Sequence, residues 1–299
     1  MKHKKIAGLD INPPKGSAFA IETPKGLPKL HCVSLFIGKR GSGKTVALAS
    51  LLKNYMDSGC LDRLIIVSPN YLSNKHIFEG LPISEDDVYT EPDATTVKDI
   101  ISKIEQESQE YEAYQEKLRI WKKLTQTHSE LLPFELMSIF DGVTGDFTKP
   151  THKYNGKKPV VHVIFDDCQG SAIFSPKARL SNMVIRHRHI GAFNKLKGAI
   201  GCSLHFCVQS YKSSSAGLPR TIRNQATFVC LFKTKDAHEL KEIGEECSGE
   251  VSEDQFNKVY EEATSEPHSF LMLDFHKCCT DPSMFRKRFD TYLISNESK

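Results

Sequence analysis

A glycine-rich segment at residues 38–45, Gly-Lys-Arg-Gly-Ser-Gly-Lys-Thr, constrains the fold of this chain more than any other feature. It has the spacing G-x4-G-K-[ST], follows an apolar run at 31–37 and precedes a helix-like segment at 46–56. Glycines let successive backbone N–H groups turn inward around a phosphate, and the following helix adds the positive end of its dipole. The pattern predicts a strand–loop–helix unit that binds a nucleoside triphosphate through Gly38, Lys39, Arg40, Gly41, Ser42, Gly43, Lys44 and Thr45.

A second motif is the apolar run at 160–165, which ends in the adjacent acids Asp166 and Asp167. At a strand end, Asp166 would hold Mg²⁺ opposite the Thr45 hydroxyl, while Lys44 would reach the β- and γ-phosphates. Asp167 would then act as the base that orients and deprotonates the attacking water. Alone, such a run is often only a strand-ending turn. Together with the upstream loop it predicts a hydrolase, because the second carboxylate favours water over a bound acceptor.

The rest of the chain alternates between short apolar runs and helix-like segments, a pattern typical of an α/β fold with a mostly parallel sheet flanked by helices. We expect strands at 31–37, 63–68, 160–165, 203–208, 227–232 and 269–275. We expect helices at 46–56, 96–127, 175–190, 237–246 and 253–263, the last introduced by Ser252. The predicted organisation is an irregular leader at 1–30, an NTPase domain at 31–290 and a tail at 291–299.

The segment 96–127 predicts a long helix inserted into the α/β domain. Thr96 and Asp99 have the spacing of a capping box, and apolar residues then recur at intervals of three and four. Acids dominate its first half and bases its second, which matches the helix dipole. The helix could lie on its own domain or contact a neighbouring subunit, and the sequence does not decide between these roles.

The formal net charge of +3 conceals a strongly uneven distribution. Residues 1–56 carry +8, residues 57–167 carry −8, residues 168–235 carry +11 with no acid at all, and residues 236–299 carry −8. The acid-free block is either a solvated basic face or a surface for nucleic-acid phosphates. On charge alone, Lys195, Lys197 and Lys212 are candidates for contacts with DNA in a pore.

The acid-free block also holds the remaining candidate site residues. Gln209 follows the run at 203–208, at a strand end where ligands of parallel sheets gather, and could sense the γ-phosphate or position water. An arginine supplied to a neighbour's γ-phosphate can stabilise the charge of the transition state. The candidates are Arg186, Arg188, Arg220 and Arg223, and each could instead bind phosphate within its own subunit.

The cysteine and hydropathy patterns argue against a disulfide-bonded protein, a Cys/His metal site or a membrane protein. The nine cysteines include no Cys-x-x-Cys pair, which predicts free thiols in a reducing compartment. Cys202, His205 and Cys207 come nearest to a metal cluster, but we expect His205 and Cys207 on opposite faces of their strand and interpret them as core residues. The apolar runs are too short for a membrane helix, and no apolar stretch follows the basic N-terminus, so we expect no secretory signal.

Taken together, these motifs resemble the genome-packaging ATPases of the FtsK/HerA superfamily, the type found in poxviruses, other nucleocytoplasmic large DNA viruses and virophages. The resemblance spans about residues 31–290. It rests on GKRGSGKT at 38–45, IIVSPN at 65–70, VIFDD at 163–167, IRHRH at 185–189, FCVQSY at 206–211 and LPRTIRNQAT at 218–227.

The resemblance implies a P-loop NTPase fold of the ASCE/RecA-like class, in which an extra strand separates the phosphate-loop strand from the acidic strand. It implies ATP and Mg²⁺ as cofactors and a homo-oligomeric ring, a pentamer or hexamer, that drives double-stranded DNA through its pore into a capsid. Asp167 would be the catalytic acid, Gln209 the sensor and Arg188 the first choice for the arginine finger, ahead of Arg220 and Arg223. Many relatives have Glu where Asp167 stands, and the helix at 96–127 has no counterpart role.

The leading hypothesis is therefore an ATP-driven translocase that packages a viral genome, located in the host cytoplasm, the virion or both, with capsid or portal-vertex proteins as further partners. One alternative is a nucleoside or small-molecule kinase, which would share the phosphate loop. The other is a regulatory NTP-binding module that acts through its long helix; the lack of an Asn-Lys-x-Asp motif weakens a guanine-specific form.

Overall fold

The expected alternation of strands and helices is present in the computed structural model, which describes residues 22–127, 131–142, 145–212, 217–247, 249, 251–277 and 280–294. The strands are β1 (Val33–Ile37), β2 (Arg63–Val67), β3 (Val88–Tyr89), β4 (Phe140–Asp141), β5 (Asp146–Phe147), β6 (Val161–Asp166), β7 (Ser203–Val208), β8 (Phe228–Phe232), β9 (Phe270–Asp274), β10 (Phe285–Lys287) and β11 (Thr291–Tyr292). The α-helices are α1 (Lys44–Asp57), α2 (Tyr71–Asn74), α3 (Thr96–Lys122), α4 (Pro133–Ile139), α5 (Leu180–Arg186), α6 (Arg220–Arg223), α7 (Ala237–Cys247) and α8 (Glu253–Ala263).

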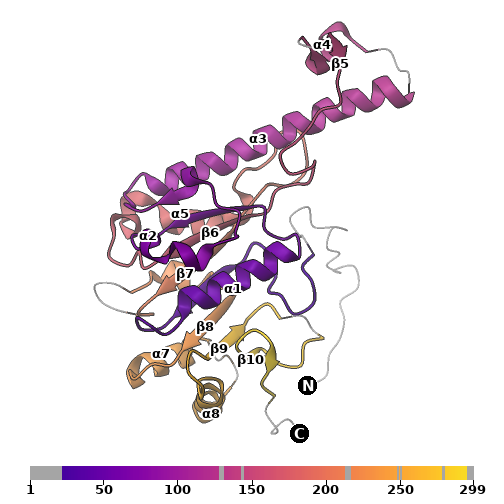
Figure 1. Ribbon diagram of the computed structural model, residues 1–299. Helices are drawn as coiled ribbons and strands as arrows, with labels where there is room; N and C mark the ends of the chain where they lie inside the picture. Colours follow the sequence, from indigo (N-terminus) through magenta and orange to yellow (C-terminus); the bar gives the residue numbers. More distant parts are fainter. Residues whose placement is uncertain are drawn as a thin grey trace, which may run out of the picture.

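Nine of the strands form one sheet in the order β11-β10-β9-β8-β1-β7-β6-β2-β3 (Figure 1). The strands from β8 to β3 in this order run parallel, whereas β9, β10 and β11 continue the sheet antiparallel. β7 lies between β1 and β6 and pairs with both, which confirms the extra strand that the resemblance implies. The phosphate loop, Gln209 and the tandem acids therefore follow three adjacent strands at the carboxyl edge of the sheet.

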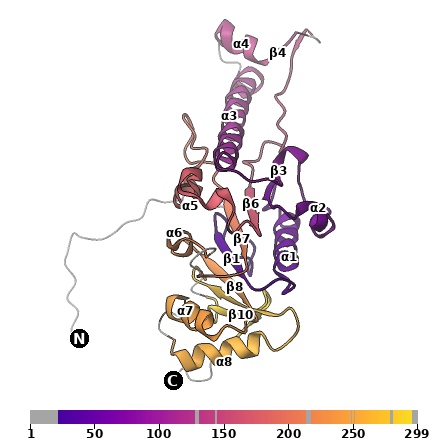
Figure 2. The same cartoon turned by 90° about the vertical axis from the view of Figure 1, so that its left-hand side faces the viewer.

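Helices cover both faces of the sheet because its parallel strands are apolar on both sides. α1 packs on one face through Leu48, Leu52 and Tyr55, together with α2. The other face is covered by α5, α6, α7, α8 and the first turns of α3 (Figure 2). This layering confirms the predicted α/β fold, and the sheet extends to β11, just past the expected boundary at residue 290.

The long inserted helix is present as α3, which continues as a π-helical turn at Lys123–Thr127. Val97, Ile100 and Ile104 anchor its first half in the core. Its second half extends away from the sheet and carries α4, β4 and β5 at its far end (Figure 1). The expected capping box is wrong: the side chain of Asp93 instead accepts hydrogen bonds from the backbone N–H groups of residues 95 and 96.

The segment expected as one helix at 175–190 is broken into shorter pieces. Pro176–Ala178 and His187–His189 form 3-10 turns on either side of α5. The break is at Arg179, whose φ of +58° is in the left-handed region and interrupts the helical hydrogen-bond ladder. Pro176 leaves its preceding residue extended, as a proline requires, so the chain begins α5 only after this turn.

The expectation that His205 and Cys207 occupy opposite faces of β7 is wrong, because residues two apart on a strand share a face. Both side chains lie on the α1 side, where His205 joins a buried chain of hydrogen bonds. Ser34 Oγ lies 2.7 Å from His205 Nδ1, His205 Nε2 lies 2.9 Å from His162 Nδ1, and His162 Nε2 lies 3.1 Å from the carbonyl oxygen of Cys60. That oxygen only accepts, so His162 Nε2 and His205 Nε2 both carry hydrogen, and Ser34 donates.

All the cysteines within the described residues are free and buried, namely Cys32, Cys60, Cys168, Cys202, Cys207, Cys230 and Cys247. Cys278 and Cys279 lie outside the described residues, as does most of the expected leader at 1–30. Among the described helices, none is both long and apolar enough to cross a bilayer.

Candidate nucleotide-binding site

The loop between β1 and α1 has the backbone of a phosphate cradle. Gly41 and Gly43 have φ angles of +77° and +99°, which residues with a side chain rarely adopt. A Cβ atom on Gly38 would lie 2.7 Å from Phe232 Cβ and 2.8 Å from Ser42 Oγ, so only glycine allows the loop to close here. The Ser42 hydroxyl is buried and has no hydrogen-bond partner in the described structure, as expected for a group that a phosphate oxygen would satisfy.

Lys44 is the first residue of α1 and lies buried inside the loop. Its Nζ atom donates hydrogen bonds to the carbonyl oxygens of Gly38 at 2.7 Å and Lys39 at 3.2 Å. The ammonium group thus donates its hydrogen bonds to backbone carbonyl oxygens rather than to a carboxylate. A phosphate oxygen entering the cradle would offer this cation a full negative charge, which makes a stronger hydrogen bond than a carbonyl does.

Thr45 and Asp166 meet across the sheet edge. Thr45 Oγ1 donates to the carboxylate of Asp166, with distances of 3.2 and 3.5 Å to its two oxygens. Asp166 is 1% exposed, and burial together with the neighbouring charge of Asp167 raises its pKa to about 6. A hydroxyl and a buried carboxylate side by side are oxygen ligands of the kind Mg²⁺ prefers, and a dication would compensate the buried negative charge. These two residues therefore fit the predicted metal position.

Asp167 and Gln209 are also brought together. Gln209 Nε2 donates to Asp167 Oδ1 at 3.3 Å, so the predicted sensor contacts the predicted catalytic acid. Asp167 has a φ of +51°, and its N–H donates to the Cys207 carbonyl of the adjacent strand. A left-handed residue without glycine's freedom is strained, and such strain is found often at functional sites.

The sequence reasoning missed Gln169, which braces the two strand ends. Its Oε1 accepts from the backbone N–H of Gln209 at 2.7 Å, and its Nε2 donates to the carbonyl of Ser210 at 2.9 Å. The side chain thereby fixes the loop after β7 relative to the acids after β6. Its position two residues after Asp167 was the only available signal, because the pairing depends on the β6–β7 contact.

None of the three arginines ranked for the arginine finger lies beside the phosphate loop of its own chain; these are Arg188, Arg220 and Arg223. Arg188 is exposed and follows His187, whose Nε2 is 2.8 Å from the carbonyl oxygen of His31, just before β1. This is the amino edge of the sheet, at the opposite end of β1 from the loop. Arg220 is exposed on α6, before the start of β8. Arg223, also on α6, bonds Glu246 at 2.6 Å and stacks on Tyr211.

The acid-free block is partly neutralised by the acids of α7. Besides Arg223, Lys212 pairs with Glu246 at 2.7 Å, which removes it from the set of free cations. Lys195 and Lys197 remain exposed in the turn between Ile190 and Ala199, beside α3. Arg186 at the end of α5 is exposed as well.

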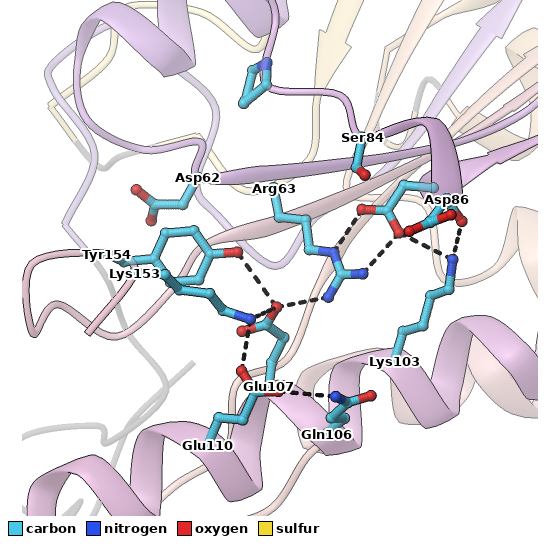
Figure 3. Close-up of a pocket in the computed structure, with 12 residues that line it drawn as sticks. Asp62, Arg63, Ser84, Asp86, Lys103, Gln106, Glu107, Glu110, Lys153 and Tyr154 are labelled. Atoms are coloured by element: carbon cyan, nitrogen blue, oxygen red, sulfur yellow. Dashed lines mark hydrogen bonds and ion pairs between the residues drawn. The ribbon is translucent and has the colours of Figure 1, made fainter. Parts of the chain in front are cut away.

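Apart from the phosphate loop, a polar pocket of about 450 Å³ lies where α3 meets the start of β2 (Figure 3). Arg63 donates to Asp87 through Nε and Nη2 and to Glu107 through Nη1, all at 2.7 Å. Lys153 pairs with Glu107 at 2.6 Å and with Glu110 at 2.8 Å. Lys103 adds a third cation, which pairs with Asp87 at 3.1 Å. The three cations and three acids of this α3-root cluster neutralise one another, which indicates a structural role.

No protein-family model matches the chain, and no curated protein matches it. Among solved structures, it is similar to the genome-packaging NTPase B204 of Sulfolobus turreted icosahedral virus 2 in complex with sulfate, with 14% identity over 88% of this chain and 98% of that one and a TM-score of 0.43. It is also similar to the pCW3 conjugation coupling protein TcpA, with 14% identity over 88% and 62% of the chains and a TM-score of 0.43. The cytoplasmic domain of the type VII secretion ATPase EccC of Thermomonospora curvata gives 14% identity over 90% and 26% and a TM-score of 0.40.

Proposed function

We propose that the chain is an ATP-hydrolysing translocase that packages double-stranded viral DNA into a capsid. The observation that carries the NTPase part is the convergence, at three adjacent strand ends, of a phosphate cradle, the Thr45–Asp166 pair and the Asp167–Gln209 pair. The ordered motifs shared with the packaging ATPases support the translocase part. The chain would work in the host cytoplasm, in the virion or in both.

In this proposal the cradle and Lys44 hold the β- and γ-phosphates of ATP, and Thr45 and Asp166 hold Mg²⁺. When bound, Mg²⁺ supplies positive charge that neutralises the phosphates. Asp167 accepts a proton from the attacking water, and Gln209, which already contacts Asp167, orients that water. Because Asp167 lies at the end of β6 beside the metal position, a single strand end supplies both acids.

Arg188 is the arginine that best fits a role between subunits. It is exposed at the edge of the sheet opposite its own phosphate loop, so any contact with a γ-phosphate must be made to a neighbour. We propose a homo-oligomeric ring, pentameric or hexameric, in which Arg188 reaches the next site. Adding the Arg188→Ala variant to the Lys44→Ala variant should restore part of the ATPase activity, because mixed interfaces combine an intact loop with an intact arginine.

DNA would be bound through phosphate contacts that do not depend on sequence, as a motor moving along any duplex requires. Lys195 and Lys197 remain candidates for such contacts because both are exposed. The proposal does not assign this role to Lys212, whose charge is paired with Glu246.

The deciding experiment is the rate of ATP hydrolysis with and without duplex DNA at low salt, alongside the solution mass of the assembly. Duplex DNA should raise the rate, and the increase should fall steeply as salt is added. The Asp167→Asn variant should bind ATP and lose turnover, whereas Asp57→Asn, an exposed acid at the end of α1, should behave as wild type. Unchanged turnover with DNA argues against the translocase, and phosphate transfer to a nucleoside argues for a kinase.

A further inference from the structure

A turn from the antiparallel side of the sheet lies against the phosphate loop. It connects α8 to β9 at residues 264–269 and is held to the β10 side by Glu266, which bonds Lys287 at 2.8 Å and Arg288 at 2.7 Å. His268 in this turn has a φ of +58°, a left-handed conformation that is uncommon for residues other than glycine. Such strain persists where surrounding contacts determine the backbone, and it occurs often beside functional sites.

The His268 ring contacts two consecutive residues of the phosphate loop. Its Nδ1 lies 3.3 Å from the carbonyl oxygen of Ser42, and since that oxygen only accepts, Nδ1 carries the hydrogen. A Cβ atom on Gly43 would lie 3.4 Å from both the Cβ and the Nδ1 of His268, so the ring covers this glycine closely. His268 thereby packs against the Ser42–Gly43 part of the loop.

The contact fixes the orientation of one peptide group. The described peptides are all trans, and in a trans peptide the C=O and the N–H point in opposite directions. The Ser42 carbonyl points toward His268, so the Gly43 N–H of the same peptide plane points away from this ring. An N–H at this position is a donor that a phosphate cradle needs.

We infer that His268 is a positioning residue for phosphate binding: by holding the Ser42 carbonyl toward its own ring, it keeps the Gly43 N–H directed at the phosphate. The inference rests on the proposed nucleotide site and adds a residue that lies 225 positions beyond Gly43 and outside every nucleotide motif of the sequence. It also gives the antiparallel part of the sheet a role at the site, because the turn that leads from α8 into β9 presents the histidine.

Four chains test this role: wild type and the variants His268→Gly, His268→Asn and His268→Asp. Glycine adopts a positive φ without strain but has no donor. Asparagine tolerates the same backbone and places its Nδ2 where histidine has Nδ1, whereas aspartate is nearly isosteric with asparagine but only accepts. We expect ATPγS with Mg²⁺, measured by titration calorimetry, to bind His268→Gly about fivefold more weakly, as loss of one hydrogen bond predicts. His268→Asn should stay within about twofold of wild type, and His268→Asp should be weakest.

Unfolding temperature without nucleotide separates positioning from general stability. His268→Gly should melt at or above the wild-type temperature, because the backbone strain is relieved while the loop contact is lost. Equal ATPγS affinity of wild type and His268→Gly overturns the inference, as does an asparagine variant no better than the glycine variant. Absence of ATPγS binding by the wild type itself overturns the proposed nucleotide site and the inference with it.

Discussion

Two clusters of charged side chains lie at opposite ends of the parallel strands, and they are built differently. At the amino end, Arg63 begins β2 and belongs to the α3-root cluster, whose cations are matched by acids (Figure 3). At the carboxyl end, Lys44 rests on carbonyl oxygens and Asp166 pairs with a hydroxyl. The first cluster completes its charge balance within the chain, and the second does not.

The difference separates a structural cluster from a site. Charges that neutralise one another stabilise the contact between α3 and the sheet and leave little for a ligand to satisfy. Among the buried side-chain atoms that the structure describes in the α3-root cluster, only Glu107 Oε2 has no hydrogen-bond partner. The residues at the carboxyl end instead include the buried cation Lys44, the buried acid Asp166 and the Ser42 hydroxyl, which has no hydrogen-bond partner in the described structure. In the proposed function, a polyanion with a divalent cation would supply what these groups lack.

The largest expected effect is on ATP binding by Lys44→Ala. In the proposed site Lys44 would face the phosphates, so removing this buried cation should weaken binding or turnover on the order of 100-fold or more. Stability should change by about 1 kcal/mol or less, because only hydrogen bonds to two carbonyls are lost. Titration calorimetry and urea unfolding measure the two effects. Lys53→Ala, an exposed lysine on the same helix, is the matched control and should alter neither.

The converse is expected at the α3-root cluster. Arg63→Met removes the arginine from Asp87 and Glu107, whose side chains are each 2% exposed, and leaves each acid one lysine, Lys103 or Lys153. The lost charge-assisted hydrogen bonds should cost about 1.5–3 kcal/mol of unfolding free energy. ATP affinity of the folded variant should match wild type, since Arg63 is at the far end of the parallel strands from the phosphate loop. A variant of normal stability with impaired ATP binding would reverse the assignment of the two clusters.

Most residues of the candidate site could be singled out from the sequence because its parts are local. A phosphate loop needs its eight residues in one turn, and an acid or glutamine at a strand end is recognised once the strand is recognised. The strand order put these predicted parts side by side, with β7 between β1 and β6. The paired positions of Thr45, Asp166, Asp167 and Gln209 follow from that order.

What the sequence did not reveal depends on contacts between distant segments. His268 reaches the phosphate loop only because β9 returns antiparallel beside β8, and Gln169 acts across two strands. The break at Arg179 could not be predicted because helical turns flank it on both sides, at Pro176–Ala178 and Leu180–Arg186. The pairing of Arg223 with α7 likewise required the tertiary fold, because the opposite charges are 23 residues apart.

The buried hydrogen-bonded pair His162 and His205 is a third polar group that can be compared with the two charged clusters. It is expected to make the unfolding free energy depend on pH. Burial lowers the pKa of His162 to about 3 and that of His205 well below 6.5, so both are neutral when folded. Below pH 6.5 the unfolded chain binds protons that the folded chain does not, so unfolding free energy falls as pH falls. Each histidine contributes a slope of about 1.4 kcal/mol per pH unit in this range.

Urea unfolding across this pH range tests the assignment. His205→Gln should reduce the acid slope by the contribution of one histidine, while the exposed His238→Gln should leave it unchanged. An unchanged slope in His205→Gln would mean that His205 is protonated in the folded chain. Unlike Lys44, neither histidine should affect ATP binding at neutral pH. Their chain of hydrogen bonds ends on the backbone carbonyl of Cys60, away from the phosphate loop.

The smallest effect is expected farther along α3, where the same pairing chemistry is exposed to water. Arg119 bonds Glu116 at 2.7 and 3.0 Å with a geometry as good as that of Arg63, but the two side chains are 50% and 42% exposed. Water and salt screen such a pair, so Arg119→Met should leave the midpoint of urea unfolding unchanged within error. If Arg119→Met lowered the midpoint as much as Arg63→Met, pairing geometry rather than burial would set the strength of these clusters. An unchanged midpoint shows that Arg63 stabilises the chain because the side chains of its partners, Asp87 and Glu107, are buried.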